Sequence, residues 1–369
     1  MKKVLYVTTV SLTLNTFLIP HIRYLKEKGY DVQIASNIDV ELSNIFNELG
    51  VNHTKIDFSR NPFSIKNVNA YKQIQRLEKE EKFDVIHVHT PVASFITRAA
   101  LKNENIKIIY TCHGFHFYDG APLMNWAIYY PIEKLAARWT DILVTINKED
   151  FNRAEKFRLR ENGQVKLMHG VGLESEKYDI KEFDKSSYRK ELGLKDDDFV
   201  ILILAELNKN KNHIQLINAM KLLNYKYPGI KCLCAGDGPL KEKLEEKSKE
   251  FDLDKNIKFL GFRTDVKELI NISNCVALFS KREGLGKCLL EGMMAGKPLL
   301  ATNTRGPREV IENNKNGYLV KIGDYQKTAE YIKNIYLDTV KRNNFSKYSL
   351  SKIDKYYLEN VLSDIEKYY

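Results

Sequence analysis

Short apolar runs alternate along this chain with longer segments in which apolar and polar residues are mixed. Each run suits a buried strand, and the longer segments suit helices, the first of which, 15–28, ends at Gly29. Apolar strands that alternate with helices indicate parallel sheets covered on both faces. We predict strands at 4–8, 31–35, 85–89, 107–111 and 142–146, and a second set at 199–204, 230–235, 257–260, 275–280 and 298–301.

The two sets of strands predict two Rossmann-like units, and 369 residues suit two domains of common size. Between the sets lies a glycine-rich crossing at 168–173, followed by a charged stretch with little apolar content. We place the interdomain hinge at this crossing. The predicted organisation is an N-terminal domain at 1–170, a C-terminal domain at 171–345 and a helical segment at 346–369.

Composition narrows the class of protein. Hydrophobic residues make up 43% of the chain and charged residues 29%, as in soluble globular proteins. No apolar run approaches 18 residues, and the N-terminus lacks the apolar core of a signal peptide, so we expect a cytoplasmic protein. The five cysteines are scattered and offer no second ligand pair for zinc, which favours reduced, packed thiols.

The net charge of +10 is spread over both halves of the chain. Neither half has the basic stripe with interleaved aromatic residues that a nucleic-acid binder needs, and we expect no nucleic acid partner. The excess suits a protein that acts on anionic diphosphates at an anionic membrane surface. General solubility explains it equally well.

The most informative segment is 281–298, in which two carboxylates flank a glycine turn. Gly284 and Gly286 allow a ligand to approach the backbone, and the helix expected after them would attract a diphosphate to its N-terminus. Glu283 could accept hydrogen bonds from sugar hydroxyls, and Glu291, about two helical turns further on, could reach a ribose. Solvated glutamates beside an ordinary turn are the alternative, but the combination favours a nucleotide-sugar site.

Glu283, seven intervening residues, Glu291 and the sequence Ala-Gly-Lys-Pro at 295–298 resemble the signature of family 4 retaining glycosyltransferases. The resemblance extends over nearly the whole chain, and the segments 235–240 and 261–266 stand in family order. It implies an α/β GT-B fold, with two Rossmann-like domains facing a central cleft. The N-terminal domain would serve the acceptor and the C-terminal domain the nucleotide sugar, while 346–369 would pack back on the N-terminal domain.

The resemblance also implies roles for individual residues. His113 follows a strand at the edge where open α/β sheets bind ligands, and His116 lies in the same aromatic loop. His87 and His89 alternate on one strand and are more typical of structural positions, although His89 stands at the strand's end. The predicted catalytic residues are His113, Glu283 and Lys211; the predicted donor residues are Glu291, Gly284, Leu285, Gly286, Lys287, Arg263, Gly236 and Gly238; the predicted acceptor-side residues are Asn15, Phe17 and His116.

Two segments depart from the family pattern. The loop after the first strand, at 9–17, lacks the usual glycine pair, and Asn15 there could simply cap a helix. Glu206 stands where many members have an arginine, so Lys211 would lack a partner cation unless Arg282, Lys287 or Arg305 supplies one.

Two acidic sites have plainer interpretations. Asp265 suits a helix N-cap for the segment that follows it. The acidic run at 196–198 precedes a strand and is interpreted as a solvated loop, so we expect no required metal or other cofactor.

The sequence therefore predicts a retaining, metal-independent hexosyltransferase. It would move an N-acetylhexosamine or related hexose from a nucleotide sugar, with UDP favoured over GDP, to a polyprenyl-diphosphate-linked saccharide in capsular or exopolysaccharide assembly. Peripheral contact with an anionic membrane would bring enzyme and acceptor together. Two alternatives stay open: a GT-B nucleotide-sugar epimerase, and a catalytically silent nucleotide-sugar-binding scaffold subunit.

Overall fold

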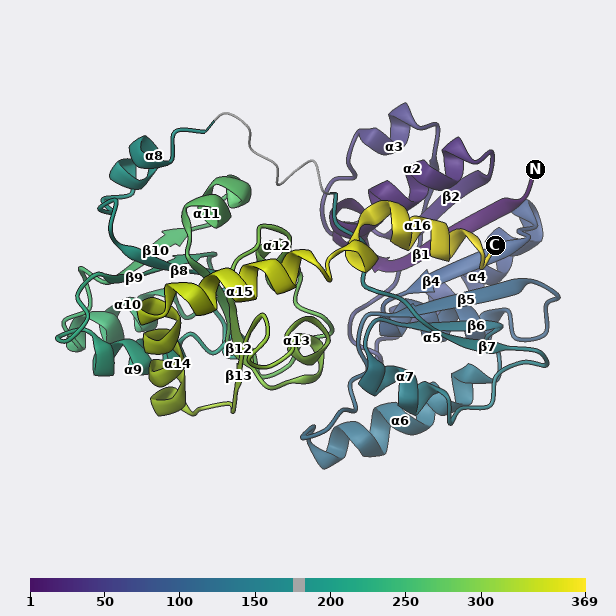
Figure 1. Cartoon of the computed structure of the whole chain (residues 1–369). Helices are drawn as coiled ribbons and strands as arrows, with labels where there is room; N and C mark the ends of the chain where they lie inside the picture. Colours follow the sequence, from purple (N-terminus) through teal and green to yellow (C-terminus); the bar gives the residue numbers. More distant parts are fainter. Residues whose placement is uncertain (175–182) are drawn as a thin grey trace. The chain divides into compact units, whose positions relative to one another are not determined.

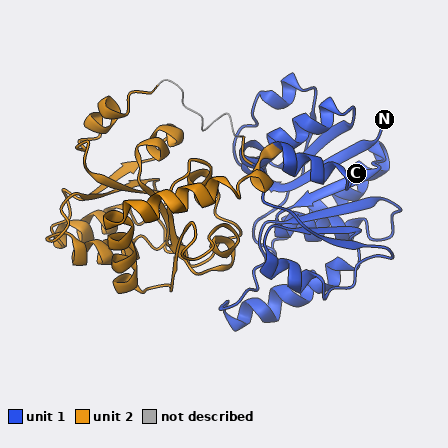
Figure 2. Ribbon diagram, in the orientation of Figure 1, with its two compact units in different colours: residues 1–172, 359–369 blue, residues 173–358 orange. Residues whose placement is uncertain are grey.

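The computed structural model describes residues 1–174 and 183–369. The chain forms two compact units, one of residues 1–172 with 359–369 and the other of residues 173–358 (Figure 2). Each unit is built on a single parallel sheet with helices on its faces (Figure 1). The predicted fold class, α/β with two Rossmann-like sheets, is confirmed.

Unit 1 has a seven-stranded sheet in the order β3-β2-β1-β4-β5-β6-β7. All its strand pairs are parallel. The strands are β1 Lys3–Val10, β2 Asp31–Asn37, β3 Asn52–Lys55, β4 Val85–His89, β5 Lys107–Cys112, β6 Ile142–Thr145 and β7 Gln164–Leu167. The helices are α1 Ser11–Thr13, a π-helix at Leu14–Leu18, α2 Ile19–Glu27, α3 Ile45–Glu48, α4 Lys66–Glu81, α5 Pro91–Ala100, α6 Leu123–Ala137, α7 Lys148–Ala154 and α16 Leu358–Glu366.

Unit 2 has a six-stranded parallel sheet in the order β10-β9-β8-β11-β12-β13. Its strands are β8 Phe199–Leu204, β9 Ile230–Ala235, β10 Ile257–Gly261, β11 Cys275–Leu278, β12 Leu299–Thr302 and β13 Gly317–Val320. Its helices are α8 Lys185–Glu191, α9 Ile214–Leu223, α10 Lys241–Glu250, α11 Val266–Ile272, α12 Lys287–Met294, α13 Arg305–Val310, α14 Tyr325–Leu337, α15 Thr339–Leu350 and a 3₁₀-helix at Asp354–Tyr356.

Each sheet of the protein separates hydrophobic layers because its central strands are apolar on both faces. In unit 2, residues of α9, α10 and α14 pack on one face of the sheet around Leu216, Leu244 and Ile332. Residues of α11 pack on the other face around Leu269. All five cysteines are free and buried, as the sequence predicted.

The strands that sequence reasoning missed are β3, β7 and β13, and each is an edge strand of its sheet. β3 and β7 read Asn-His-Thr-Lys and Gln-Val-Lys-Leu, and neither has a fully buried residue. An edge strand has a neighbour on one side only, so it needs no apolar run and gives no clear pattern.

Two local predictions were wrong. The helix expected at 15–28 begins earlier, at Ser11, and passes through a π-helical turn at Leu14–Leu18 before α2. The acidic run at 196–198 is only partly solvated, since Asp198 is buried and its carboxylate accepts a hydrogen bond from the Lys195 amide at 2.7 Å.

The segment 346–369 divides between the two units. Residues up to 358 belong to unit 2, and 359–369 belong to unit 1. There the Tyr369 hydroxyl donates to the Tyr6 hydroxyl at 2.5 Å and bonds to His87 Nδ1, with all three side chains buried. The last residues thus complete the core of unit 1.

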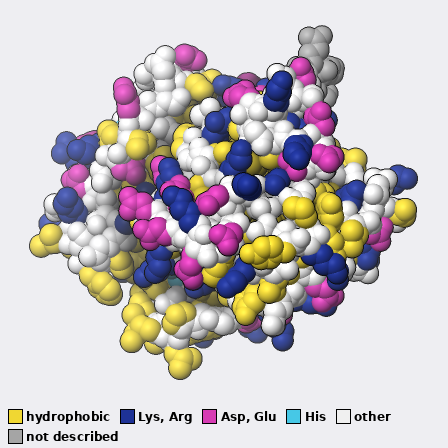
Figure 3. Space-filling model, turned by 90° about the vertical axis from the view of Figure 1, so that its left-hand side faces the viewer, with side chains coloured by type: hydrophobic (Ala, Val, Ile, Leu, Met, Phe, Trp, Pro, Cys, Tyr) yellow, Lys and Arg dark blue, Asp and Glu magenta, His cyan; other side chains and the backbone are white. Residues whose placement is uncertain are grey.

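One face of the protein shows how its charges are distributed. On the face shown in Figure 3, basic and acidic side chains are interspersed, and no broad area carries one sign alone. Within residues 1–174 and 183–369, no helix combines the length and the apolar character needed to cross a membrane.

Candidate active site

The sheet of unit 2 reverses its strand order between β8 and β11. From β8 the chain adds β9 and β10 on one side, and it then returns to place β11 on the other side. Open α/β sheets bind ligands at such a switch point, outside the carboxyl ends of the strands. The loops after β8 and β11 carry Lys211 and Glu283, and the structure brings these two predicted residues together.

Lys211 and Glu283 form an ion pair. Lys211 Nζ lies 2.5 Å from Glu283 Oε1, and both side chains are partly exposed. A pair exposed to water contributes little to stability. Each partner can therefore exchange the other for a ligand group: the lysine for a phosphate, and the carboxylate for sugar hydroxyls.

Hydrogen bonds hold the two loops in register. The Asn210 side-chain amide donates to the Arg282 carbonyl at 3.0 Å, and the Lys281 amide donates to the Asn210 carbonyl at 2.8 Å. Asn208 Oδ1 accepts from the amide of Lys211 at 3.0 Å. These bonds fix the backbone that presents Lys211, whereas its side chain can turn from Glu283 to a ligand.

The glycine turn after Glu283 leads into α12 as the sequence predicted. Gly286 is the N-cap and has a φ of +89°, a conformation that favours glycine. A Cβ on Gly306 of α13 would lie 2.7 Å from the Leu285 amide nitrogen, so α13 packs directly on the turn. Arg305, which is buried, donates from Nε to the Glu283 carbonyl at 3.1 Å. Sequence reasoning missed Gly306, although the pair Arg305-Gly306 follows a strand end.

Glu291 lies on α12 and is buried. Its carboxylate Oε1 is 3.5 Å from Lys287 Nζ, one helical turn earlier. The predicted donor residues of α12 therefore form a charged pair whose lysine is half-exposed and whose carboxylate is held inside.

Only glycine fits at positions 236 and 238, for a structural reason that the sequence did not reveal. A Cβ on Gly236 would lie 2.0 Å from the Ala205 carbonyl oxygen, and one on Gly238 would lie 2.7 Å from that of Leu207. These glycines let the loop after β9 pack on the loop after β8. The close approach is between two protein loops, and it supports the backbone that leads to Lys211.

Arg263 stands in the loop after β10 and pairs with Asp265, with Nε 2.8 Å from Oδ1. The Tyr188 hydroxyl also bonds to the Asp265 carboxylate. The hydrogen bond from Arg263 lowers the pKa of Asp265, whereas burial and then Asp265 raise the pKa of Tyr188 to about 12. Asp265 occupies the N-cap position of α11, as the sequence predicted, but its side chain makes no capping bond and pairs with Arg263 instead.

The sheet of unit 1 has its own switch point, between β1 and β4. His89 ends β4, and its Nδ1 lies 3.1 Å from Nε2 of His113, which follows β5. Burial, and to a lesser extent His21, lowers the pKa of His113 to about 4, so its ring is neutral at pH 7. His89 Nε2 has no hydrogen-bond partner among the described residues. The structure therefore gives His89 a direct contact with the predicted catalytic histidine.

His87 continues the buried layer behind His89. Its Nε2 lies 2.7 Å from Thr111 Oγ1, its Nδ1 bonds to Tyr369, and its ring stacks on His89 at 4.3 Å between centroids. Burial lowers the pKa of both histidines well below the usual value. The layer is neutral, and the structural role that the sequence favoured for His87 agrees with these contacts.

The acceptor-side candidates lie in unit 1 and are not gathered into one cluster by the contacts of its residues. Asn15 does not cap a helix: its Oδ1 accepts from the Ser43 amide at 3.0 Å and its Nδ2 donates to the Glu41 carbonyl at 2.8 Å. Phe17 is 38% exposed. The His116 ring packs on Tyr129 at 4.7 Å between centroids.

Two aromatic residues of the His116 loop turn inward. Phe115 and Phe117 are buried and stack on each other at 4.6 Å between ring centroids. They pack in the core of unit 1 and cannot line a sugar pocket. Across the described residues no three His, Cys, Asp or Glu side chains are grouped as metal ligands.

The two parallel Rossmann-like sheets, each with its own switch point, are the architecture of the GT-B class. Comparison with known sequences gives the family. Residues 184–352 match the glycosyl transferases group 1 family, and residues 3–147 match the glycosyl transferase 4-like family. The chain belongs to the group 1 (GT4) glycosyltransferases.

Two curated relatives illustrate the range of similarity. Over 339 residues the chain is 36% identical to EpsD of Bacillus subtilis strain 168, whose assignment as a glycosyltransferase is provisional, covering 91% of this chain and 87% of EpsD. It is 27% identical over 275 residues to the Escherichia coli UDP-Gal:alpha-D-GlcNAc-diphosphoundecaprenol alpha-1,3-galactosyltransferase, covering 72% of this chain and 69% of that enzyme.

Among solved structures, HepE of Anabaena in complex with UDP and glucose aligns with a TM-score of 0.83 at 18% identity, covering 100% of this chain and 99% of HepE. WaaG, a glycosyltransferase involved in lipopolysaccharide biosynthesis, aligns with a TM-score of 0.75 at 15% identity and 98% coverage of both chains. These likenesses establish the GT-B fold.

Proposed function

We propose that this protein transfers a hexose or N-acetylhexosamine from a UDP-sugar, with retention of configuration, to a polyprenyl-diphosphate-linked saccharide in capsular or exopolysaccharide assembly. The E. coli relative is named for a UDP-sugar and a diphosphoundecaprenol-linked acceptor, and HepE has been crystallised with UDP-glucose. The similarity to EpsD over most of both chains supports glycosyl transfer, and the similar CapM of Staphylococcus aureus is named for capsular polysaccharide biosynthesis.

The observation that carries the proposal is the ion pair of Lys211 and Glu283 at the switch point of unit 2. In the proposed complex Lys211 turns to the diphosphate, and Glu283 accepts hydrogen bonds from the sugar. The amides from Gly284 to Gly286, at the N-terminus of α12, add donors for the phosphate oxygens. Fixed donors of this kind stabilise the negative charge that develops on the departing diphosphate.

The reaction that follows is a same-face substitution. The bond from the anomeric carbon to the UDP oxygen breaks, and a bond from the same carbon to the acceptor oxygen forms on the same face. The acceptor hydroxyl's proton passes to an oxygen of the departing diphosphate. His113 is proposed to hydrogen-bond to the donor sugar. Because its pKa is about 4, it brings no positive charge to a centre that itself becomes positive.

The proposed site of action is the cytoplasmic face of an anionic membrane, with which the protein makes peripheral contact. The net charge of +10 supports attraction to such a surface. Closure about the crossing at 169–173 is proposed to exclude water, which would otherwise compete with the acceptor.

The test is nucleotide release from a panel of UDP- and GDP-sugars, with and without polyprenyl-diphosphate-linked saccharides, in the presence of EDTA. Acceptor-dependent release from a UDP-sugar, with an NMR spectrum showing the donor's anomeric configuration in the product, is expected. Isomerisation of the donor without acceptor would identify an epimerase. Binding of the UDP-sugar without release would identify a scaffold subunit.

A further inference from the structure

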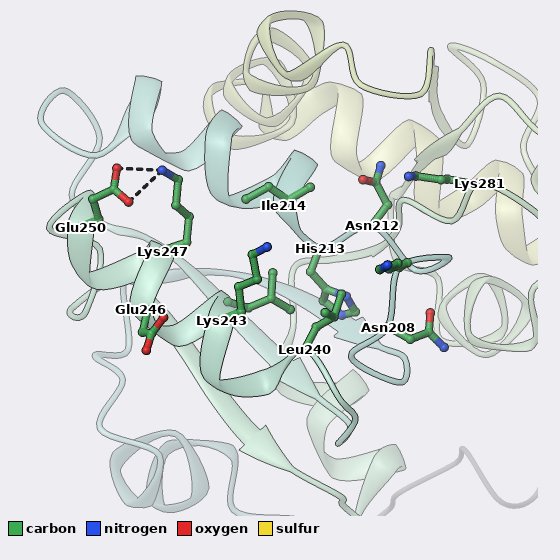
Figure 4. Close-up of a pocket in the computed structure, with 12 residues that line it drawn as sticks. Asn208, Asn212, His213, Ile214, Leu240, Lys243, Glu246, Lys247, Glu250 and Lys281 are labelled. Atoms are coloured by element: carbon green, nitrogen blue, oxygen red, sulfur yellow. Dashed lines mark hydrogen bonds and ion pairs between the residues drawn. The ribbon is translucent and has the colours of Figure 1, made fainter.

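A pocket in unit 2 lies on the other side of the loop that presents Lys211. It has a volume of about 560 Å³, within the range of ligand-binding pockets. The loop after β8, the start of α9, one side of α10 and Lys281 line it (Figure 4). None of the predicted donor residues is among its lining residues, so it is separate from the donor edge.

His213 is the feature of this pocket that the rest of the protein does not explain. It is 1% exposed, and neither ring nitrogen has a hydrogen-bond partner among the described residues. In Figure 4 its ring lies beside Leu240, within the lining. A buried polar group without a partner costs about 1–3 kcal/mol, and a neutral imidazole has both a donor and an acceptor to satisfy. A ligand with polar edges would satisfy both.

The charges around the pocket favour an anion. Lys209, Lys243 and Lys281 line it, and none of them forms an ion pair within the described part of the chain. Lys247 is neutralised by Glu250 at 2.7 Å, which leaves Glu246 as the opposing charge. Three lysines against one glutamate give a positive rim.

The first turn of α9 reinforces this preference. The helix spans ten residues from Ile214, its N-cap is His213, and no side chain caps it. Helix N-termini carry partial positive charge and free amides, which favour negative groups. The lysines and the helix N-terminus favour a negative group, and the buried imidazole favours a polar one. Together they indicate an anionic ligand with further polar atoms.

The remaining wall of the pocket is apolar, which favours a ligand with an apolar part over an inorganic ion. Ile214, Leu240 and Leu244 line it between α9 and α10. A free phosphate would leave these side chains and His213 without contacts. A flat heterocycle would pack its faces on the leucines while its edge bonded to the imidazole.

We propose that this pocket binds a nucleoside phosphate, with the base beside His213, Leu240 and Leu244 and the phosphate among Lys209, Lys243 and Lys281. The same loop presents Lys211 to Glu283. The pocket is therefore a second nucleotide site beside the donor edge, and it does not depend on the identity of the transferred sugar.

The test measures binding by calorimetry to the full-length protein carrying Lys211→Met, which weakens nucleotide binding at the donor edge and lies outside the lining of the pocket. The probes are UMP, AMP, GMP, inorganic phosphate and geranyl phosphate. We expect saturable binding of at least one nucleoside monophosphate. Lys243→Ala should weaken it about tenfold, as loss of a charge-assisted hydrogen bond does. The exposed Lys249→Ala on the same helix, outside the lining, should change it less than twofold.

His213→Leu provides a second arm. It should abolish nucleotide binding while leaving the melting temperature unchanged or higher, because it removes a buried unpaired group. The proposal is overturned if no probe binds to the protein with the weakened donor edge, or if Lys243→Ala and Lys249→Ala behave alike. Equal affinity for inorganic phosphate, or preference for geranyl phosphate, would also overturn the nucleoside assignment.

Discussion

The two switch points of this protein share an architecture and differ in chemistry. In unit 2, the loops after β8 and β11 carry an exposed ion pair and a glycine turn that opens α12. In unit 1, the corresponding edge carries neutral groups: Thr9 and Thr90 hydroxyls lie 2.7 Å apart, and His89 contacts His113. A Rossmann-like sheet supplies the place for a ligand, and the loops decide which kind.

The difference suits the two halves of a glycosyl transfer. A diphosphate needs positive charge and the N-terminus of a helix, and unit 2 offers Lys211 and the start of α12. Sugar hydroxyls are neutral and need groups that donate and accept without carrying charge, which the histidines and threonines of unit 1 offer. In unit 1 the residue after β4, Thr90, has a φ of +64°, an unusual value for a β-branched residue.

The largest expected effect is on turnover, from a change in the ion pair at the switch point of unit 2. Glu283→Gln should lower turnover about 100-fold or more, as removal of one preorganised group at a transition state does, while folding and UDP affinity persist. The measurement is kcat and KM for acceptor-dependent UDP release, with UDP binding followed separately. Glu330→Gln, on the exposed face of α14, is the matched control. Turnover near that of the unmodified protein would remove Glu283 from the mechanism.

Lys211→Met tests the other partner of the same ion pair. It should weaken UDP binding as well as turnover, because it removes the cation for the diphosphate. Combined with Glu283→Gln, the loss should be much smaller than the product of the two single losses, since the residues act as a unit. Multiplicative losses would show that the ion pair has no shared role.

Acid should destabilise unit 1 before unit 2. The pKa values of His21, His87, His89 and His113 are lowered in the folded unit 1, chiefly by burial, and in unit 2 that of His213 is lowered to about 4. Below about pH 6.5 these histidines bind protons in the unfolded chain, whereas in the folded chain they stay neutral. The free energy of unfolding therefore falls as the pH drops from 6.5 towards 4. For His113, with a folded pKa of about 4, the loss is on the order of 3 kcal/mol by pH 4.

The two tryptophans make this measurable, because Trp126 and Trp139 both lie in unit 1. The free energy of unfolding of unit 1 can be measured in urea from the fluorescence of these tryptophans. It should fall steeply as the pH is lowered from 6.5 to 4.5. Far-ultraviolet circular dichroism, which also reports unit 2, should show a second transition that shifts less. Coincident shifts would contradict the contrast between the two units.

A smaller effect, on thermal stability and UDP binding, is expected where Gly306 packs on the glycine turn at 284–286. Gly306→Ala would place a Cβ 2.7 Å from the Leu285 amide nitrogen, so the turn or α13 must move, at a cost of about 1–3 kcal/mol. Gly229→Ala is the control, since its Cβ would lie 3.6 Å from the Tyr336 hydroxyl, an ordinary van der Waals contact. Thermal melting and the UDP dissociation constant check the two variants, and equal behaviour would show that the turn tolerates displacement.

The smallest expected effect concerns His89, which positions His113 through the 3.1 Å contact. His89→Ala should lower kcat about tenfold with little change in KM, the usual size of a lost positioning hydrogen bond. His89→Asn, which keeps a hydrogen-bonding group, should recover part of the loss. A uniform rise in KM with unchanged kcat would contradict a positioning role.

The core of each sheet was predictable because burial dictates its residues. β4, β8 and β9 begin and end where their apolar runs do, and Glu283 and Lys211 follow strand ends that the pattern located. The edge strand β3, with its sequence Asn-His-Thr-Lys, has no such pattern. The contacts of Asn15 with Ser43 and Glu41 join segments far apart along the chain, and only the fold reveals them.

The same distinction holds for the glycines. Gly286 was predictable as a turn residue, whereas the reason for Gly236 lies in a carbonyl of the neighbouring loop. His213 gave no signal at all, because an unpaired nitrogen becomes visible only once its neighbours are known.

The burial of Tyr369 against Tyr6 and His87 has a consequence for biosynthesis. Residues 359–369 complete unit 1, yet the ribosome makes them only after all of unit 2. The nascent N-terminal half must wait with part of its hydrophobic interior open until residues 359–369 have been made. Chaperone engagement during synthesis should therefore centre on unit 1 and end once these residues dock.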